Sequence, residues 1–235
     1  MGPYERERRR RRLNPRFVIL CLSAALLVLT VAVIAVLIGK SRGLPGEGGP
    51  GEELPVPDYV EKDYLPVNQW SRPGEPLEKI RGVVIHYVGN PGTSARANRN
   101  YFASLASGQE EIYASSHFIV GLEGEVIQCV PLTEIAYASN SRNEDTVSVE
   151  VCHPDEEGRF ERASYDRAVE LTAWLCREFK LDPEEDVIRH YDVTGKDCPR
   201  YYVEHPQAWE DFRADVAAAL AVLSKTPAET EEGKR

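Results

Sequence analysis

Hydrophobic residues follow two different patterns along the chain. Between residues 17 and 39, the sequence FVILCLSAALLVLTVAVIAVLIG is dominated by apolar residues and carries no charge. Between residues 60 and 226, short β-branched runs alternate with longer segments that have apolar residues at helical spacing. The segment 40–59 is rich in Gly, Pro and Glu, which predicts a linker without a core of its own. We therefore expect one folded domain behind a long apolar segment.

The apolar run predicts an uncleaved transmembrane helix. As a helix with a rise of 1.5 Å per residue, residues 17–39 would be roughly 34 Å long, against a bilayer hydrocarbon core of about 30 Å. A buried core helix would have a polar face, which this run lacks. The apolar part of a secretory signal is usually only about 7 to 15 residues long. Both alternatives are therefore disfavoured.

The charges around this run predict its orientation. Residues 1–16 contain seven Arg and two Glu, whereas only Lys40 and Arg42 follow the run directly. Because basic residues are enriched on the cytoplasmic side of membranes, we expect residues 1–16 to form a basic cytoplasmic tail. Residues after 40 are then expected outside the cell membrane, in a single-pass arrangement.

Periodicity within residues 60–226 predicts an α/β domain, followed by a short unstructured tail at 227–235. Strands that alternate with helices indicate a central sheet covered on both faces. The predicted strands are residues 81–88, the two arms of a hairpin within 117–130, 146–152, and a short strand near 187–188. The predicted helices are residues 94–107, 164–180 and 207–223.

Composition and charge exclude several classes of protein. The chain has 28 basic and 38 acidic residues, a net charge of −10, and the acidity is concentrated after residue 42. A nucleic-acid-binding protein normally needs a basic face that displaces counterions, so we expect no nucleic-acid partner. The apolar content of 42% and the length of the domain also exclude disorder and a disulfide-stapled miniprotein for this part.

The most informative chemical pattern is the segment HYDVTGKDC. His190 and Cys198 are separated by a seven-residue loop that includes Gly195, enough for an imidazole nitrogen and a thiolate to bind one metal ion. His86, at the end of a buried strand, is the natural candidate for a third ligand. Two His and one Cys would leave one position of a Zn²⁺ tetrahedron to water, as catalytic zinc sites do. Taken alone, the pattern fits a satisfied core histidine and a buried thiol equally well.

Four segments together resemble a known family. In chain order they are GVVIHYVGNPGTSARANRNYF, SSHFIVGLEGEVIQ, NEDTVSVEVCHPDEEGRF and RHYDVTGKDCPRYY. They are similar to the zinc-dependent N-acetylmuramoyl-L-alanine amidases of the phage and bacterial cell-wall type, relatives of the peptidoglycan recognition proteins. The resemblance covers Val83 to Phe212, and the HYxxxGKxCP block is its most specific part. It implies a mixed β-sheet flanked by helices, one Zn²⁺, and hydrolysis of the amide between the muramic acid lactyl group and L-alanine of peptidoglycan stem peptides.

The resemblance also implies roles for individual residues. The zinc ligands would be His86, His190 and Cys198. Glu150, in the strand VSVEVC, occupies the position of a family Glu and would act as the base, whereas its alternative is a solvated position on an edge strand. Lys196, two residues before the Cys ligand, would stabilise the oxyanion as a point charge, whereas its alternative is a solvated loop residue.

Two positions depart from the pattern of the family. Many relatives have a Tyr directly before His117, where this chain has Ser116, and a His in a later turn, where this chain has Ala138. Neither group is available here, which places the proton transfer on Glu150. His117 itself is a candidate substrate-binding residue or, alternatively, a packed strand histidine bonded to a backbone carbonyl.

Other polar residues of the domain have ordinary explanations. His153 and His205 both precede Pro in polar segments and are interpreted as surface residues. Asp192 and Asp197 would orient the metal ligands or, more simply, cap or solvate their loop. Cys176, on the apolar face of a predicted helix, is expected to be a buried, unpaired thiol.

The sequence thus predicts a membrane-anchored zinc amidase, with its domain at 60–226 facing the cell wall and peptidoglycan or muropeptides as its substrate. A non-catalytic muropeptide-binding module of the same fold is the first alternative, but relatives that only bind typically lack the Cys ligand. A scaffold with a structural zinc is the second, and it would require a fourth protein ligand close to the other three.

Overall fold

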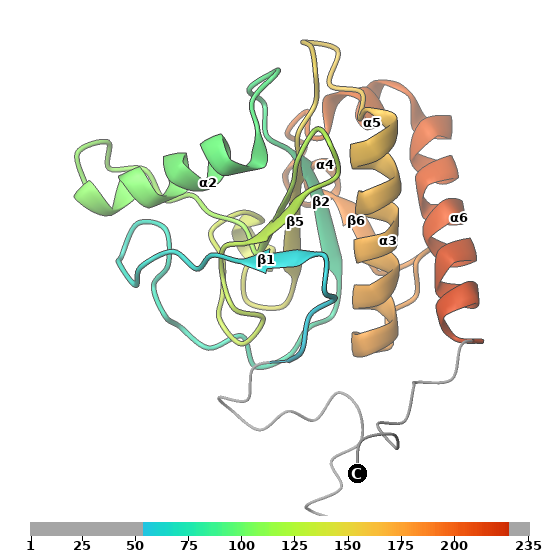
Figure 1. Cartoon of the computed structure of the whole chain (residues 1–235), viewed down its shortest axis with the longest axis horizontal. Coiled ribbons are helices and arrows are strands. Elements are labelled where there is room, and N and C mark those ends of the chain that lie inside the picture. Colours follow the sequence, from blue (N-terminus) through green and yellow to red (C-terminus); the bar gives the residue numbers. More distant parts are fainter. Residues whose placement is uncertain (1–53, 226–235) are drawn as a thin grey trace, which may run out of the picture. The chain divides into compact units, whose positions relative to one another are not determined.

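The computed structural model describes residues 54–225 of the chain (Figure 1). The predicted transmembrane helix at 17–39, the basic tail at 1–16 and the tail at 227–235 lie outside the described residues. Within 54–225, no helix is both long enough and apolar enough to cross a membrane.

The domain is built on one six-stranded mixed sheet with the strand order β1-β4-β3-β5-β2-β6. β3 and β4 form the predicted antiparallel hairpin, and every other pair of neighbours is parallel. The strands are β1 (Val60–Lys62), β2 (Val83–Tyr87), β3 (Phe118–Val120), β4 (Val126–Gln128), β5 (Val147–Val151) and β6 (Val187–Arg189). The structure therefore confirms a mixed central sheet, and it adds β1 at one edge.

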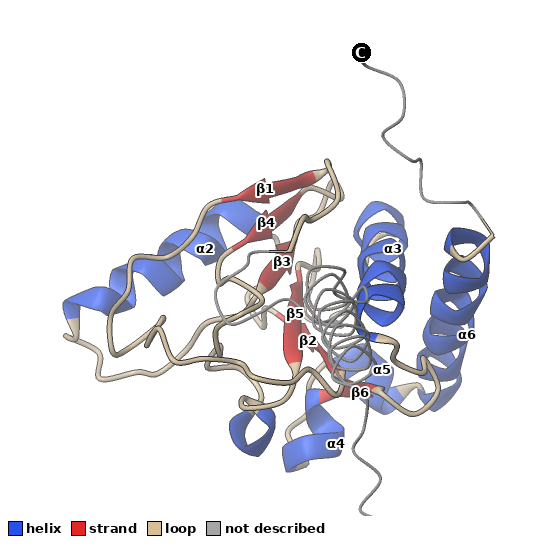
Figure 2. Cartoon of the chain, turned by 90° about the horizontal axis from the view of Figure 1, so that it is seen from below, coloured by secondary structure: helices blue, strands red, loops and turns tan. Residues whose placement is uncertain are grey.

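Helices cover both faces of this sheet, as predicted (Figure 2). One face carries α2 (Ala95–Ser104), whereas the other carries the paired helices α3 (Arg162–Phe179) and α6 (Pro206–Leu223). Alternate strand residues point to opposite faces, so Phe118 packs with the α3 and α6 side and Ile119 with the α2 side. Both side chains are fully buried.

β2 and β5 lie next to each other in the interior of the sheet and bring two site candidates together. Their parallel register pairs His86 directly with Glu150. Ile85 and Val149 belong to the core on the α3 and α6 side, so His86 and Glu150 point to the α2 side. Because β5 has neighbours on both sides, the edge-strand explanation of Glu150 is wrong.

The sequence predicted a simple loop between His190 and Cys198, but part of this segment is helical. His190–Thr194 forms α4, a single helical turn that follows β6 directly. The carboxylate of Asp192 accepts hydrogen bonds from the backbone N–H and the guanidinium of Arg189, so its capping role is confirmed. Gly195 ends the turn with a φ of +75°, a conformation that glycine adopts without strain.

Two further segments differ from the prediction. Leu54, Val56 and Tyr59, assigned to the linker, pack against the core beside α3 and α6. A second short helix, α5 (Arg200–Glu204), follows the Cys198 segment, and Asp197 pairs with Arg200 at its start. Apolar residues at both places find partners from distant parts of the chain, which a local pattern does not reveal.

Candidate metal centre

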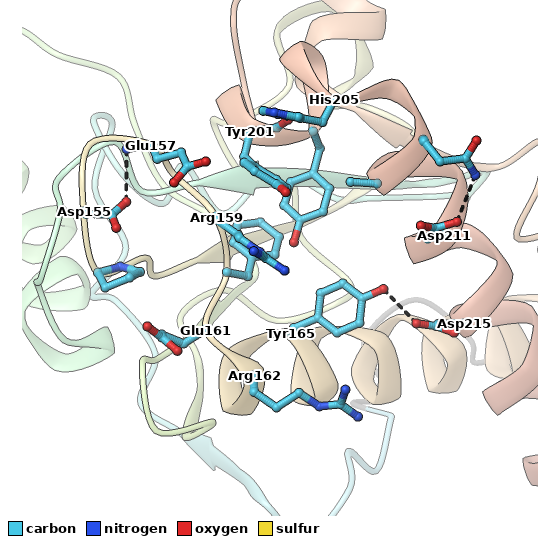
Figure 3. Close-up of a pocket in the computed structure, with 15 residues that line it drawn as sticks. Asp155, Glu157, Arg159, Glu161, Arg162, Tyr165, Tyr201, His205, Asp211 and Asp215 are labelled. Carbon is cyan, nitrogen blue, oxygen red and sulfur yellow. Dashed lines mark hydrogen bonds between the residues drawn. The ribbon is translucent and has the colours of Figure 1, made fainter.

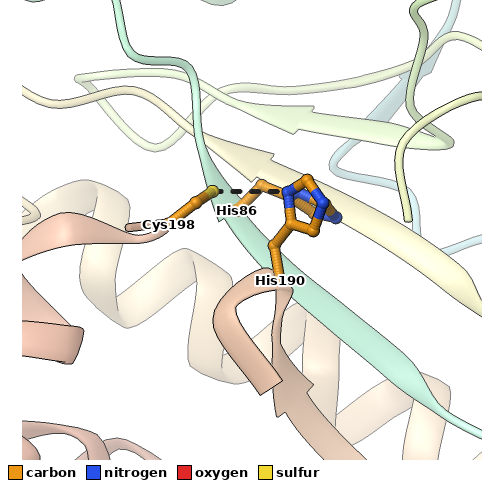
Figure 4. A group of neighbouring side chains, drawn as sticks. All are labelled: His86, His190 and Cys198. Atoms are coloured by element: carbon orange, nitrogen blue, oxygen red, sulfur yellow. Dashed lines mark hydrogen bonds between the residues drawn. The ribbon is translucent and has the colours of Figure 1, made fainter. Parts of the chain in front are cut away.

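His86, His190 and Cys198 converge at the end of β2, as Figure 4 shows. Their ligand atoms all lie within 4.8 Å of one another, and all three residues are buried. Nδ1 of His86 lies 3.9 Å from Sγ of Cys198, and the two imidazole rings have centroids 4.6 Å apart. The structure thus brings together the three side chains that the sequence singles out as ligands.

The chemistry of these three residues fits a zinc ion. Burial lowers the pKa of both imidazoles, which favours the neutral form that binds metal. Burial and the nearby Glu150 raise the pKa of the Cys198 thiol to about 12, so its thiolate requires a cation beside it. Nδ1 of His190 is buried without a hydrogen-bond partner in the described part of the chain. A buried nitrogen of this kind is costly unless a ligand satisfies it.

Glu150 lies beside the cluster but is not a member of it. Its Oε1 is 4.0 Å from Nδ1 of His86, and its side chain is 16% exposed. Its Oε2 is buried and has no hydrogen-bond partner among residues 54–225. Burial raises the pKa of Glu150 to about 8, and the positive charge of Lys196 opposes this rise. The described residues therefore offer a ligand set of two His and one Cys, without the fourth protein ligand that a structural zinc requires.

A cavity of about 630 Å³ opens at this cluster. Lys196 is exposed on its wall and is the second residue after α4. The cavity walls also include Glu150, the three ligand candidates, Phe102, Tyr113, Tyr137, Ala138, Asn140 and Asn143. The cavity therefore presents the three candidate ligands, a carboxylate and an ammonium group to the same space.

His117 does not line this cavity. It is 1% exposed, and its Nδ1 accepts a hydrogen bond of 3.0 Å from the backbone N–H of Ser148. Its Nε2 lies 3.0 Å from the backbone oxygen of Glu134. This geometry fits the packed strand histidine bonded to a carbonyl, rather than a substrate-binding residue.

His153 is buried, so its interpretation as a surface residue is wrong. It is 1% exposed, its Nδ1 lies 2.7 Å from the backbone oxygen of Asp155, and its ring stacks on Tyr87. His205 is exposed, as expected, and Cys176 is a buried, free thiol, as expected. Residues before Pro are biased only in backbone conformation, so the motif did not reveal the burial of His153.

Sequence reasoning missed two residues in contact with the ligand candidates. Oγ of Ser139 lies 3.2 Å from Nε2 of His86, and Oδ1 of Asn140 lies 2.9 Å from Nε2 of His190. Both residues belong to the polar stretch SNSRN between β4 and β5. Such a stretch signals a turn, and nothing local connects it to the histidines.

A second cavity, of about 870 Å³, lies where α3 and α6 begin (Figure 3). Its walls carry five carboxylates together with Arg159 and Arg162. Tyr201 stacks on His205 there, and the hydroxyl of Tyr165 donates a hydrogen bond to Asp215. None of the ligand candidates lines this larger cavity. Volume alone therefore does not identify the candidate site.

Comparison with known proteins agrees with the geometry. The chain is 33% identical over 185 residues to N-acetylmuramoyl-L-alanine amidase BlyA of Bacillus subtilis (strain 168), covering 70% of this chain and 48% of that protein. It is 31% identical over 190 residues to the amidase CwlL of Bacillus licheniformis, covering 75% and 52%. The chain thus spans about half the length of these relatives.

The fold also matches a solved structure, a mutant endolysin from Bacillus subtilis. The TM-score is 0.56 at 25% identity, over 67% of this chain and 97% of the endolysin. The sequence pattern of the N-acetylmuramoyl-L-alanine amidase family matches residues 76–201, which include all the ligand candidates, Glu150 and Lys196. This match covers more than half of the chain, which therefore belongs to the N-acetylmuramoyl-L-alanine amidase family.

Proposed function

We propose that this chain is a zinc-dependent N-acetylmuramoyl-L-alanine amidase, which hydrolyses the amide between the muramic acid lactyl group and L-alanine of peptidoglycan stem peptides. The observation that carries the proposal is the convergence of His86, His190 and Cys198 in a cavity that also holds Glu150 and Lys196. Family membership and the names of the two Bacillus relatives support it.

The residues around the cavity divide the chemistry of amide hydrolysis among them. His86, His190 and Cys198 would hold Zn²⁺, which supplies a Lewis acid to polarise the scissile carbonyl and to activate water. Glu150, with an unpartnered buried oxygen, would take a proton from the attacking water and pass it to the departing amine of L-alanine. Lys196 would stabilise the negative charge that develops on the carbonyl oxygen.

Aromatic residues on the cavity wall would contact the substrate. Tyr113 is 56% exposed, and its ring packs against Trp70 and, edge to face, against Tyr137. Exposed aromatic rings held by such contacts offer rigid apolar surface at low entropic cost. We expect this wall to carry the apolar face of the muramic acid sugar.

The proposal includes a location at the cell membrane. Residues 17–39 would anchor the protein in a single pass with a cytoplasmic N-terminus, so that the amidase domain faces the cell wall from outside. The uncharged apolar run and the excess of Arg before it support this orientation. A tethered enzyme gains local concentration on an insoluble substrate close to the membrane.

A digestion experiment tests the activity. The full chain, purified in detergent, is incubated with peptidoglycan after zinc has been removed with a chelator and after it has been restored. We expect mass spectrometry to find stem peptides with a free L-alanine amine only in the zinc-loaded sample. If the zinc-loaded protein binds muropeptides but releases no peptide, the amidase proposal is wrong and the chain is a muropeptide-binding module.

A labelling experiment tests the location. Glu52→Cys and Gly2→Cys variants are treated in intact cells with a thiol reagent that does not cross membranes. In intact cells we expect the reagent to label the Glu52→Cys variant at position 52. The Gly2→Cys variant should react at position 2 only after cell lysis. Labelling of position 2 in intact cells would reverse the proposed orientation.

A further inference from the structure

Both candidate histidine ligands make hydrogen-bond contacts with one short turn. The turn is the 3₁₀ helix η2 (Asn140–Arg142), preceded by Ser139. Nε2 of His86 lies 3.2 Å from Oγ of Ser139, which is 1% exposed. Nε2 of His190 lies 2.9 Å from Oδ1 of Asn140. Adjacent residues of the turn thus contact the corresponding nitrogen of the two rings.

These contacts leave the Nδ1 atoms of both rings available. Nδ1 of His86 faces Sγ of Cys198 at 3.9 Å, and Nδ1 of His190 is buried with no partner in the described part of the chain. An amide oxygen only accepts hydrogen bonds, so Asn140 requires a proton on Nε2 of His190. A neutral imidazole protonated at Nε2 carries its lone pair on Nδ1.

The turn is held in place by its own hydrogen bonds. Oδ1 of Asn143 accepts the backbone N–H groups of Ala138 at 3.1 Å and of Ser139 at 2.6 Å. Asn140 has a φ of +51°, a left-handed conformation that Asn tolerates better than most residues. The hydroxyl of Thr146 donates to the backbone oxygen of Arg142 at 2.6 Å. Oγ of Ser139 and Oδ1 of Asn140 are therefore positioned before any ligand arrives.

We propose that Ser139 and Asn140 are positioning residues of the metal centre, which accept the Nε2–H groups of His86 and His190 and so aim both Nδ1 lone pairs at the ion shared with Cys198. Hydrogen bonds of this kind fix the tautomer and the orientation of metal-binding imidazoles. The inference rests on the proposed function only through the metal ion, because it does not depend on which bond the protein cuts.

The test combines histidine NMR with zinc affinity in the full chain. Asn140→Gly removes the acceptor of His190 and keeps a residue suited to positive φ, and Ser139→Ala removes the acceptor of His86. Ser141→Ala, in the same turn and without a side-chain hydrogen bond to the described residues, is the matched control. Asn140→Asp keeps an acceptor oxygen at the same place, so it separates loss of the acceptor from loss of the fold.

In metal-free wild-type protein we expect ¹⁵N spectra to show both rings protonated at Nε2. Asn140→Gly should change the tautomer of His190 alone, and Ser139→Ala that of His86 alone. Chelator competition should show zinc binding weakened about 10- to 100-fold in each, with Ser141→Ala and Asn140→Asp within about threefold of wild type.

Three results would overturn the inference: wild-type rings protonated at Nδ1, unchanged zinc affinity in both acceptor variants, or an Asn140→Asp variant as weak as Asn140→Gly. A protein that gives the expected tautomers and zinc affinities but leaves peptidoglycan intact would refute the amidase proposal and leave this inference standing. The two failures are therefore distinguishable.

Discussion

Two groups of polar side chains on the same face of the sheet differ in how completely they are satisfied. In the closed group, His117 has a partner at each ring nitrogen, from Ser148 and Glu134. The open group consists of the candidate ligands His86, His190 and Cys198 together with Glu150. In this group, one nitrogen of His190 and one oxygen of Glu150 have no hydrogen-bond partner within residues 54–225. Ser148 and Glu150 are only two residues apart on β5, so the difference does not come from location in the fold.

The comparison teaches that a buried polar atom without a hydrogen-bond partner marks a site only when other candidate ligands lie close to it. A buried polar atom without a partner costs folding free energy, and a protein retains it where a ligand restores the balance. His153 also has a buried nitrogen without a partner, yet among residues 54–225 it belongs to no group of three side chains that could hold a metal ion. What distinguishes the open group is that its two atoms without partners, Nδ1 of His190 and Oε2 of Glu150, belong to residues that line one cavity.

The most drastic test of this difference removes a member of the open group. Cys198→Ala should lose zinc and peptidoglycan cleavage together, because two imidazoles alone hold the ion weakly. The counterpart in the closed group, Ser148→Ala, should retain zinc and activity and cost about 1 kcal/mol of unfolding free energy. Elemental analysis and muropeptide release measure both. A Cys198→Ala protein with normal zinc content would remove Cys198 from the ligand set.

A second change separates chemistry from metal binding within the open group. Glu150→Gln keeps the size of the side chain but not its ability to accept a proton. We expect zinc content to stay at the wild-type level and kcat to fall about 10²- to 10⁴-fold. Equal losses of zinc and activity would show instead that Glu150 is a ligand. The zinc-loaded variant, compared with wild type on the same peptidoglycan, provides the measurement.

A smaller effect is expected from the exposed cation of the open group. Lys196→Met should lower kcat about tenfold and leave zinc bound, because an exposed charge is partly screened by solvent and salt. The loss should shrink further at high ionic strength, where the wild-type lysine is screened as well. Lys79→Met, which changes an exposed lysine that does not line the cavity, is the matched control. Identical kinetics for the two variants would assign Lys196 to the solvated surface.

The closed group should respond to acid through stability. Burial lowers the pKa of His117 from 6.5 to about 4, so protonation between these values favours the unfolded state. This contribution to stability is complete above pH 6.5 and is lost as the pH falls toward 4. Between pH 7 and pH 5 it amounts to about 2 kcal/mol. Urea unfolding should show that His117→Gln loses this part of the pH dependence, whereas an unchanged dependence would contradict a neutral, buried His117.

Local pattern predicted most of the framework but not how the polar segments are arranged on it. The strands around His86 and Glu150 and the helices α2, α3 and α6 are long or β-branched enough to be visible in the sequence. The interior position of β5 was not visible in the sequence, because strand order depends on contacts between distant segments. It is this order that places Glu150 beside His86 rather than in solvent.

The candidate site was predictable where the residues form a motif and hidden where they do not. His190, Lys196 and Cys198 lie within nine residues, and His86 stands out because it ends a buried, β-branched strand. Asn140 lies 50 residues from the ring that it contacts, in a turn with no recognisable signature. The burial of His153 was hidden for the same reason, since its ring stacks on Tyr87 of β2, which is distant in the sequence.

The direct pairing of His86 with Glu150 has a consequence for how this protein tolerates change. Both side chains stand on interior strands, so backbone ladder bonds rather than surface loops set their separation. Insertions or replacements in the loops around the cavity can therefore reshape the cavity while His86 and Glu150 keep their spacing. Slippage of one strand by a single residue, by contrast, would turn one of the two side chains to the opposite face and disable the protein in one step.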